Sequence, residues 1–388
     1  MQDPRLDKLA KVLVHYSVNA KPGQIVRISG PPVASPAIAA IYAEVLRAGA
    51  HPVVRCAPEE LQELFYELAS DEQLSHVSPL LEQEVETIDA SIGLWAESNT
   101  KALSAVDPAK QAKSSAARRP VMDRFMQRYA DKQLKWVGTQ YPTQASAQDA
   151  EMSLRQYADF VFAAGHLDKP DPAAEWAAIR DRQQKLADYL TGKKQIRFQS
   201  PNGTDLTVNV SDMKWVNCHG DCNFPDGEVF TGPNLDASDG GVNGTVRYSF
   251  PAVHNGNEAH GITLTFEKGR VTKATAEKGE DFLLKMLDQD EGARNLGEIA
   301  IGTNYAIQQY TKNTLFDEKI GGTFHAAVGA GYPETGNQNS SGLHWDMVCD
   351  LRSPENGGIE KVGGTITVDG EIISKDGRFM FDGWPGPI

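Results

Sequence analysis

The hydrophobic pattern of this chain changes after Gly192, and the change restricts the folds that the chain can adopt. Before Gly192, apolar residues at helical spacing alternate with short runs rich in β-branched residues. After Gly192, short alternating runs are separated by Asn-Gly, Asp-Gly or Lys-Gly turns, which are typical of antiparallel strands. The sequence therefore predicts an α/β protein with an N-terminal domain over residues 1–192 and a C-terminal α+β domain, with a mostly antiparallel sheet, over residues 193–388.

The first domain is predicted to be a layered βαβ-type domain with a largely parallel sheet, because helices and strands alternate with short connections. Its helices are predicted over residues 6–18, 36–48, 58–69, 121–129, 147–164 and 173–190, and its strands over 24–29, 52–56, 87–95 and 134–138. In the second domain the predicted strands are 195–198, 204–210, 245–249, 261–266, 270–276 and 364–368, with one helix over 281–287. The first domain contains neither a GxGxxG nor a P-loop pattern, so we predict no nucleotide cofactor site there.

Composition excludes several classes of function. A net charge of −14 argues against a nucleic-acid partner, because such proteins usually present a basic face to phosphates. The one basic cluster, DPAKQAKSSAARRP over residues 107–120, is predicted to be a solvated loop and helix start. No apolar run approaches the roughly 20 residues that span a bilayer, and the N-terminus lacks signal-peptide patterning. We therefore expect a cytoplasmic protein with no membrane partner.

Two short segments near the C-terminus carry residues that bind divalent metal ions. His344-Trp345-Asp346 lies on an extended run, which places His344 and Asp346 on one face and Trp345 on the other. The apolar residues after Asp346 indicate a buried strand, where an unpaired carboxylate would be costly. His325 and Tyr332 are seven residues apart, the spacing of two helical turns, in a segment rich in Gly and Ala.

Two upstream carboxylates complete a mixed ligand set. Glu228 follows the turn-like sequence Pro-Asp-Gly in FPDGEVFTGP, and Glu298 lies in DEGARNLGEIAIG. Carboxylates and imidazoles together are the usual ligands of zinc and related divalent ions. The second half of the chain is thus predicted to carry a metal site.

Taken in order, these segments resemble the aminopeptidase T family of dinuclear metallopeptidases, which includes aminopeptidase S. The matching segments are PDGEVFT (225–231), FEKGRV (266–271), DEGA leading to LGE (290–298), NTLFDE (313–318), His325 with Tyr332, and His344-x-Asp346. The resemblance is specific over residues 225–346. Over the N-terminal half it extends only to length and α/β patterning.

The resemblance implies a metal-dependent aminopeptidase that uses water activated by two metal ions to release N-terminal residues from peptides with a free N-terminus. The implied cofactors are two divalent ions, which could be zinc, cobalt, manganese or magnesium. The implied ligands are Glu228, Glu298, His325, His344 and Asp346, with Glu318 as a further possible ligand. Tyr332 would assist at the scissile carbonyl, and Glu298 or Glu318 would relay a proton to the departing amine. Family members form dimers, so a homodimer is implied too.

The chain departs from the family between Glu318 and His325. The family has a shorter lead, similar to Asn-Ala-Ala-Cys, where this chain has KIGGTF over residues 319–324. Because this segment is longer, Glu318 could lie in a different position relative to His325 than in the family. The Ser-Ser-Gly-Leu sequence before His344 also differs and bears on the shape of the substrate pocket.

Two other functions stay open from the sequence. His325, His344 and Asp346 are also the ligand set of a mononuclear non-haem iron oxygenase, and ring-cleaving dioxygenases of hydroxypyridines resemble this peptidase fold. Retention of Glu228 and Glu298 favours two metals over one. The second alternative is a non-catalytic peptide-binding relative, and the complete ligand set with Tyr332 argues against it.

Overall fold

The structure is a computed structural model that describes residues 3–254, 256–359, 361, 363–381 and 384. Contacts divide the chain into two compact units, Met1–Glu175 with Gly220–Pro225, and Trp176–His219 with Asp226–Ile388. The domain boundary predicted after residue 192 lies between helix α9 (Pro172–Leu190) and strand β5 (Gln195–Ser200). It stays a prediction, because compactness alone does not test which segments fold independently.

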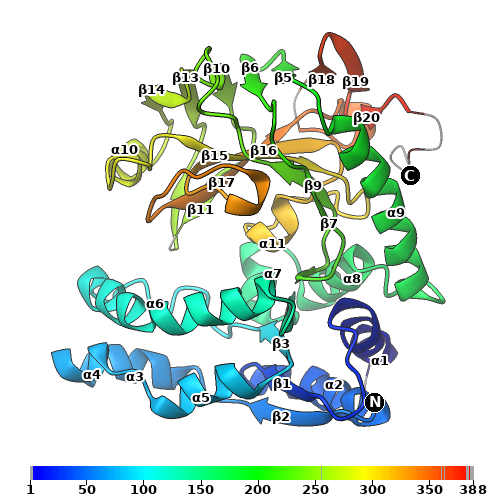
Figure 1. The fold of residues 1–388 in the computed structure, drawn as a ribbon, viewed down its shortest axis with the longest axis vertical. Coiled ribbons are helices and arrows are strands. Elements are labelled where there is room, and N and C mark those ends of the chain that lie inside the picture. Colours follow the sequence, from blue (N-terminus) through cyan, green and yellow to red (C-terminus); the bar gives the residue numbers. More distant parts are fainter. Residues whose placement is uncertain (1–2, 255, 360, 362, 382–383, 385–388) are drawn as a thin grey trace. The chain divides into compact units, whose positions relative to one another are not determined.

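The first unit is built on a parallel sheet of five strands in the order β2-β1-β3-β4-β8, of which Figure 1 labels β1, β2 and β3. The strands are β1 (Ile25–Ser29), β2 (His51–Arg55), β3 (Ala90–Trp95), β4 (Lys135–Gln140) and β8 (Asn223–Phe224). The α-helices are α1 (Pro4–Lys11), α2 (Ser35–Arg47), α3 (Glu60–Leu68), α4 (Asp71–Ser75), α5 (Pro79–Thr87), α6 (Pro108–Ala130), α7 (Gln144–Asp149) and α8 (Leu154–Ala164), with a π-helix over Val12–Ser17 and a 3-10 helix over Pro32–Ala34. The predicted parallel layer is confirmed.

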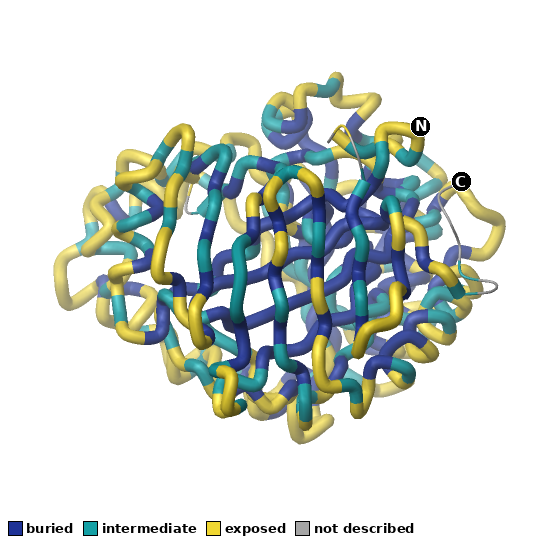
Figure 2. The backbone as a smooth tube through the Cα atoms, turned by 90° about the horizontal axis from the view of Figure 1, so that it is seen from above, coloured by how far each residue is buried: buried dark blue, intermediate teal, exposed yellow. Residues whose placement is uncertain are grey.

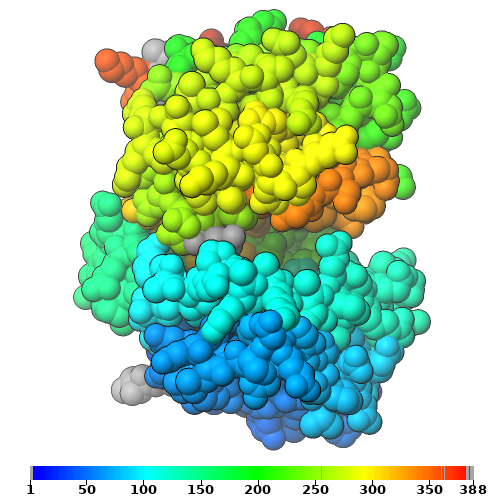
Figure 3. Space-filling view, turned by 90° about the vertical axis from the view of Figure 1, so that its left-hand side faces the viewer, coloured from blue at the N-terminus to red at the C-terminus, as the bar shows by residue number. Residues whose placement is uncertain are grey.

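Helix α6 corrects the prediction for the basic cluster. The cluster is not a loop, because one continuous helix runs from Pro108 through Pro120 to Ala130. Asp107 caps this helix by accepting a hydrogen bond from the backbone N–H of Ala109 at 2.8 Å. Near its other end, the buried Arg128 guanidinium donates to two carbonyls outside the helix. Such tertiary contacts hold a helix together across a proline that sequence patterning reads as a break. Figure 3 shows α6 in cyan on the surface of the first unit.

The prediction of one helix over residues 147–164 is wrong, because the structure contains two helices there, α7 and α8. Glu151 has a left-handed backbone with φ of 58°, which ends the first helix. Ser153 then begins the second, and its side chain forms a capping box with Gln156. The polar turn between them overrides the apolar periodicity that connects the two segments in the sequence.

The second unit contains two antiparallel sheets and a short hairpin. One sheet has the order β14-β13-β10-β6-β5-β18-β19-β20, the other has the order β17-β16-β15-β9-β7, and the hairpin pairs β11 with β12. The strands are β5, β6 (Thr204–Asn209), β7 (Val216–Cys218), β9 (Glu228–Thr231), β10 (Val242–Arg247), β11 (Ala252–His254), β12 (Asn257–Ala259), β13 (Thr263–Glu267), β14 (Arg270–Thr275), β15 (Leu296–Gly302), β16 (Thr323–Gly329), β17 (His344–Asp350), β18 (Thr365–Val368), β19 (Glu371–Lys375) and β20 (Arg378–Phe379). The helices are α9, α10 (Glu280–Leu287) and α11 (Thr314–Asp317), with 3-10 turns at Pro333–Thr335 and Pro354–Asn356. The predicted antiparallel character is confirmed.

The two sheets of the second unit differ in burial. Strands β5, β6, β13 and β18 of the eight-stranded sheet alternate between buried and more exposed residues, whereas β9, β15 and β16 of the other sheet are buried at every position. Figure 2 colours the whole backbone by burial. The rings of Phe198 in β5 and Phe324 in β16 stack with centroids 4.1 Å apart, and both residues are fully buried. The site-bearing sheet is therefore covered on one face by the eight-stranded sheet. Among the described residues, no helix is both long and apolar enough to cross a lipid bilayer.

Replacing Phe198 tests how far this packing holds the second unit together. We expect Phe198→Ala to lower the free energy of unfolding by about 3–5 kcal/mol, because it leaves a cavity between two packed sheets. Urea denaturation followed by tryptophan fluorescence measures the change. Gln195→Ala, at an exposed position of the same strand, is the control and should change it by less than about 0.5 kcal/mol. Equal effects of the two substitutions would contradict the packing argument.

Candidate metal centre

Four neighbouring strands of one sheet bring most of the predicted ligands close together. Asp346 in β17 and Glu298 in β15 both pair with Ala327 of the strand between them, β16. His325 lies on β16 itself, and Glu228 begins β9 on the far side of β15. Side chains from separate parts of the sequence therefore meet over one patch of sheet.

The alternation of His344-Trp345-Asp346 on a strand is as predicted, but the helical spacing of His325 and Tyr332 is wrong. His344 and Asp346 share one face of β17, while Trp345 points to the other and is only 2% exposed. His325 lies in a strand, not a helix, and Tyr332 follows that strand in a loop. Pairing with β15 and β17 on both sides imposes extended structure on β16, and Gly329, with φ of 100°, ends it.

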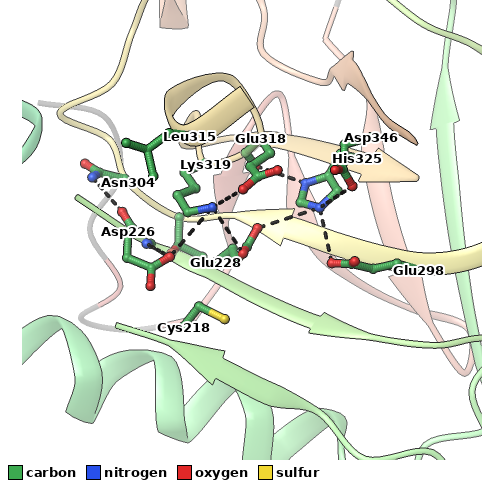
Figure 4. Close-up of polar contacts among 12 residues, drawn as sticks. Cys218, Asp226, Glu228, Glu298, Asn304, Leu315, Glu318, Lys319, His325 and Asp346 are labelled. Atoms are coloured by element: carbon green, nitrogen blue, oxygen red, sulfur yellow. Dashed lines mark hydrogen bonds and ion pairs between the residues drawn. The ribbon is translucent and has the colours of Figure 1, made fainter. Parts of the chain in front are cut away.

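The imidazoles and carboxylates converge closely, as Figure 4 shows for five of them. His325 Nε2 lies 3.4 Å from Glu298 Oε1, 3.7 Å from Glu228 Oε2 and 3.9 Å from Asp346 Oδ1. His344 Nε2 lies 3.3 Å from Glu298 Oε2 and 3.4 Å from Asp346 Oδ1. The two oxygens of Glu298 thus face different imidazoles. This arrangement divides the donors into two overlapping sets.

Backbone carbonyls fix both imidazoles in the orientation that a metal ligand needs. His325 Nδ1 lies 3.0 Å from the carbonyl oxygen of Glu318, and His344 Nδ1 lies 2.8 Å from that of Ala330. Because a carbonyl can only accept, each Nδ1 donates the hydrogen. In a neutral imidazole Nε2 then carries the free lone pair, as in the outer shell of many metal sites.

Glu228 Oε2 is a buried carboxylate oxygen with no hydrogen-bond partner. The residue is only 6% exposed, so water cannot readily satisfy that oxygen. Leaving a buried polar atom unsatisfied costs free energy, and a bound cation would remove the cost. The residues present therefore fit a divalent metal ion. One ligand atom from each of Glu318, His325 and Asp346 lies within 4.8 Å of the other two. The same holds for Glu298, His344 and Asp346.

Charge coupling within the cluster shifts its pKa values strongly. Burial disfavours both imidazolium forms, but the surrounding carboxylates outweigh it and raise the pKa of His325 to about 10 and of His344 to about 12. Burial also opposes ionisation of Asp346 and Glu298, yet the adjacent imidazoles hold the pKa of both carboxyls below the usual range. Glu228 differs, because burial prevails over the nearby Lys319 and raises its pKa to about 8. Without a metal, protons supply the positive charge in this site.

Two residues in the cluster, Lys319 and Asp226, were not predicted from the sequence. Lys319 is fully buried, and its Nζ lies 3.3 Å from Glu228 Oε1 and 3.8 Å from Asp226 Oδ1. The ammonium also forms an ion pair with the Glu318 carboxylate. The sequence signal for Lys319 was a lysine followed by Ile-Gly-Gly and then by a buried strand. Such a position indicates a buried lysine, and lysine is rarely buried without a charged partner.

Tyr332 lies at the edge of the cluster. Its ring contacts those of Phe230 and His344, with centroids 5.3 and 5.1 Å away, and the residue is 41% exposed. The structure thus brings together every site residue predicted from the sequence, Glu318 included, within the second unit.

Comparison with known proteins gives the family. The family described as thermophilic metalloprotease (M29) matches residues 2–379. The chain belongs to this family. It is therefore an enzyme of the metalloprotease class, and the sequence-based resemblance to aminopeptidases T and S is confirmed.

Two relatives are similar over most of the chain. Aminopeptidase 2 of Geobacillus stearothermophilus is 30% identical, covering 97% of this chain and 95% of its own. Aminopeptidase T of Thermus thermophilus is 29% identical over 87% of each chain. The solved structure of wild-type AmpT from Thermus thermophilus matches with a TM-score of 0.83 at 25% identity, covering 97% of this chain and 99% of that one.

A second solved structure shares the fold alone. The 2,5-dihydroxypyridine dioxygenase from Pseudomonas putida KT2440 matches with a TM-score of 0.55 at 14% identity, over 98% of this chain and 97% of that one. The fold by itself therefore does not decide between hydrolysis and oxygen chemistry.

The raised imidazole pKa values predict how pH affects the metal-free protein. The stability contributed by a group with a raised pKa is present below its unfolded pKa and is lost as pH rises to the folded one. For His325 this window runs from 6.5 to about 10, and for Glu228 from 4.5 to about 8. We expect the melting temperature of chelator-treated protein to fall as pH rises from 6.5 to 10.

Protein loaded with a divalent ion is the control for this experiment. It should lose less stability over the same window, because the ion replaces the imidazole protons. Thermal unfolding followed by circular dichroism at several pH values gives both curves. A metal-free protein that gains stability from pH 6.5 to 10 would contradict the charge coupling described above.

Proposed function

We propose that this protein is a metal-dependent aminopeptidase that releases N-terminal residues from peptides with a free N-terminus. The observation that carries the proposal is the convergence of His325, His344, Glu298, Asp346 and the unsatisfied Glu228 oxygen in an M29 metalloprotease. Relatives named aminopeptidases, similar over most of their length, support the exopeptidase assignment.

The donor arrangement supports the further proposal of two divalent ions, which could be zinc, cobalt, manganese or magnesium. Glu298, His344 and Asp346 would hold one ion, and Glu318, His325 and Asp346 would hold the other, with Glu228 beside His325. Oε2 of Glu298 faces His344 and would bind the first ion, whereas Oε1 faces His325 and would be left to carry a proton. Divalent cations bound there would lower the pKa of a water and polarise the scissile carbonyl.

Glu298 is suited to move the proton during hydrolysis. Despite burial, the two imidazoles keep its pKa below the usual value, so it is ionised at neutral pH and can accept a proton. The neighbouring Glu318 is less suited, because its carboxylate is paired with the Lys319 ammonium. We propose that Glu298 takes the proton from the attacking water and delivers it to the departing amine.

Tyr332 is suited to donate a hydrogen bond to the developing oxyanion. Partial burial of the residue and the negative charge of Glu298 and Asp346 raise its pKa, so the phenol keeps its proton at neutral pH. Ring contacts with Phe230 and His344 hold it at the edge of the ligand cluster. A preorganised donor of this kind stabilises a tetrahedral intermediate.

Ring-cleaving dioxygenase activity is the second candidate, favoured by the fold shared with the dihydroxypyridine dioxygenase. His325, His344 and Asp346 match its expected two-histidine, one-carboxylate set. Glu228 and Glu298 support the peptidase instead, because a facial triad does not use them. Oxygen uptake by the iron-loaded protein with a dihydroxypyridine tests the alternative directly.

The resemblance also leads us to propose a homodimer and a cytoplasmic location. Neither depends on the metal centre. Sedimentation of the purified protein measures the first.

Substrate turnover tests the proposed aminopeptidase. Metal-stripped protein, resupplied with each divalent ion in turn, should cleave amino-acyl p-nitroanilides, and N-acetylated analogues should not be cut. Glu298→Gln should lower kcat/KM by about 10²–10⁴-fold through loss of the proton carrier. Glu277→Gln, in an exposed ion pair with Arg247, is the matched control and should leave the rate unchanged. No cleavage under any ion would end the aminopeptidase proposal.

Replacing the Tyr332 hydroxyl separates binding from catalysis. We expect Tyr332→Phe to lower kcat by about 10²–10³-fold with little change in KM, because the lost hydrogen bond would form only in the transition state. Tyr189→Phe, which removes a hydroxyl that donates to Glu371, is the control. A rise in KM with unchanged kcat would instead give Tyr332 a role in substrate binding.

A further inference from the structure

Lys319 places a fixed positive charge inside the candidate metal centre. Its ammonium is fully buried and faces the carboxylates of Glu228, Asp226 and Glu318, as Figure 4 shows. It is also the first residue of the KIGGTF segment that leads into His325.

The ammonium is not shared equally between the two proposed ion positions. Glu318 and Glu228, which lie on the His325 side, each place a carboxylate oxygen against Lys319. On the His344 side, Glu298 and Asp346 form no ion pair with a lysine or arginine in the described part of the chain, and Asp346 also reaches the His325 side. Their contacts within the site are with the two imidazoles.

Glu228 shows the division within one side chain. Its Oε1 is 3.3 Å from the Lys319 ammonium, whereas its Oε2 has no hydrogen-bond partner and lies 3.7 Å from His325 Nε2. A cation beside His325 would thus share this carboxylate with a lysine. It would share Glu318 in the same way.

We propose that Lys319 makes the two metal positions unequal, so that the ion beside His344 binds tightly and the ion beside His325 binds weakly. This inference rests on the proposed two-ion site. An ion entering the His325 side competes with the ammonium for Glu318 and Glu228 and is repelled by its charge at close range in a buried site. The His344 side offers Glu298 and Asp346 without that competition.

Metal titration of the stripped full-length protein tests the inference without any measurement of turnover. We use Mn²⁺, with isothermal calorimetry for affinity and equilibrium dialysis for the number of ions bound. The wild-type protein should show two classes of site per chain that differ by at least about tenfold in Kd. Lys319→Met should reduce that difference by about tenfold, chiefly by tightening the weak class.

Two control substitutions separate charge from shape. Lys319→Arg keeps the positive charge and should keep the two affinities apart. Lys312→Met removes the ammonium that pairs with Glu258 at 3.4 Å, outside the metal centre, and should change neither class. If Lys319→Met does not fold, as judged by circular dichroism, Lys319→Gln provides the neutral variant.

Histidine variants assign the classes to positions. His344→Ala should remove the tight class, and His325→Ala should remove the weak one. The reverse assignment, equal affinities in the wild type, or a Lys319→Met protein with an unchanged or wider gap would overturn the inference. A wild-type protein that binds a single ion, with a second bound only by Lys319→Met, would support it.

Failure of the proposed function would look different. If amino-acyl substrates are not cleaved while two unequal classes respond to Lys319 as described, the aminopeptidase proposal fails and the role of Lys319 stands. If the wild-type protein and Lys319→Met each bind only one ion per chain at saturation, the two-ion proposal and the inference fail together.

Discussion

The concentration of like charge inside the second unit is the constraint on which the site depends. Five carboxylates, from Asp226, Glu228, Glu298, Glu318 and Asp346, gather around one buried ammonium and two imidazoles. Ionised carboxylates cannot be brought together away from water without compensating positive charge. Without a metal, the Lys319 ammonium and the two imidazoles, whose pKa values are raised, can provide part of that charge. Divalent cations can supply the rest of the positive charge. This need for compensating charge links the fold to metal binding more firmly than any single distance does.

The sheet makes that concentration of charge possible. Strands β9, β15, β16 and β17 are hydrogen-bonded neighbours, and their opposite face is packed by fully buried side chains such as Phe324 and Trp345. A packed sheet cannot relax to separate its charged side chains without losing this burial. The ligand positions are therefore set by backbone pairing before any ion arrives, which is the preorganisation that electrostatic catalysis requires.

Much of this could be predicted from the sequence, because it depended on local patterns. Helical periodicity located most helices, and alternating periodicity located β1 to β4 and six strands of the eight-stranded sheet, but not β9, β15 or β16 of the site-bearing sheet. His344-Trp345-Asp346 revealed its two faces from spacing alone. Predictions failed where tertiary contacts overruled periodicity. His325 and Tyr332 have helical spacing, but two partner strands force His325 into extended structure. Lys319 was missed for a different reason, since its role depends on Glu228 and Asp226, more than ninety positions earlier.

The short segment Gly220–Pro225 has a consequence for how the polypeptide matures. It lies between β7 and β9 of the second unit, yet it belongs to the first, where β8 adds the fifth strand to the parallel sheet beside β4. A ribosome that has finished residue 192 has therefore not yet supplied every strand of that sheet. The edge of β4 stays open until some thirty more residues emerge, so neither unit can be completed strictly before the other begins. A protease cut between the units would have to sever the backbone at more than one place to release either of them.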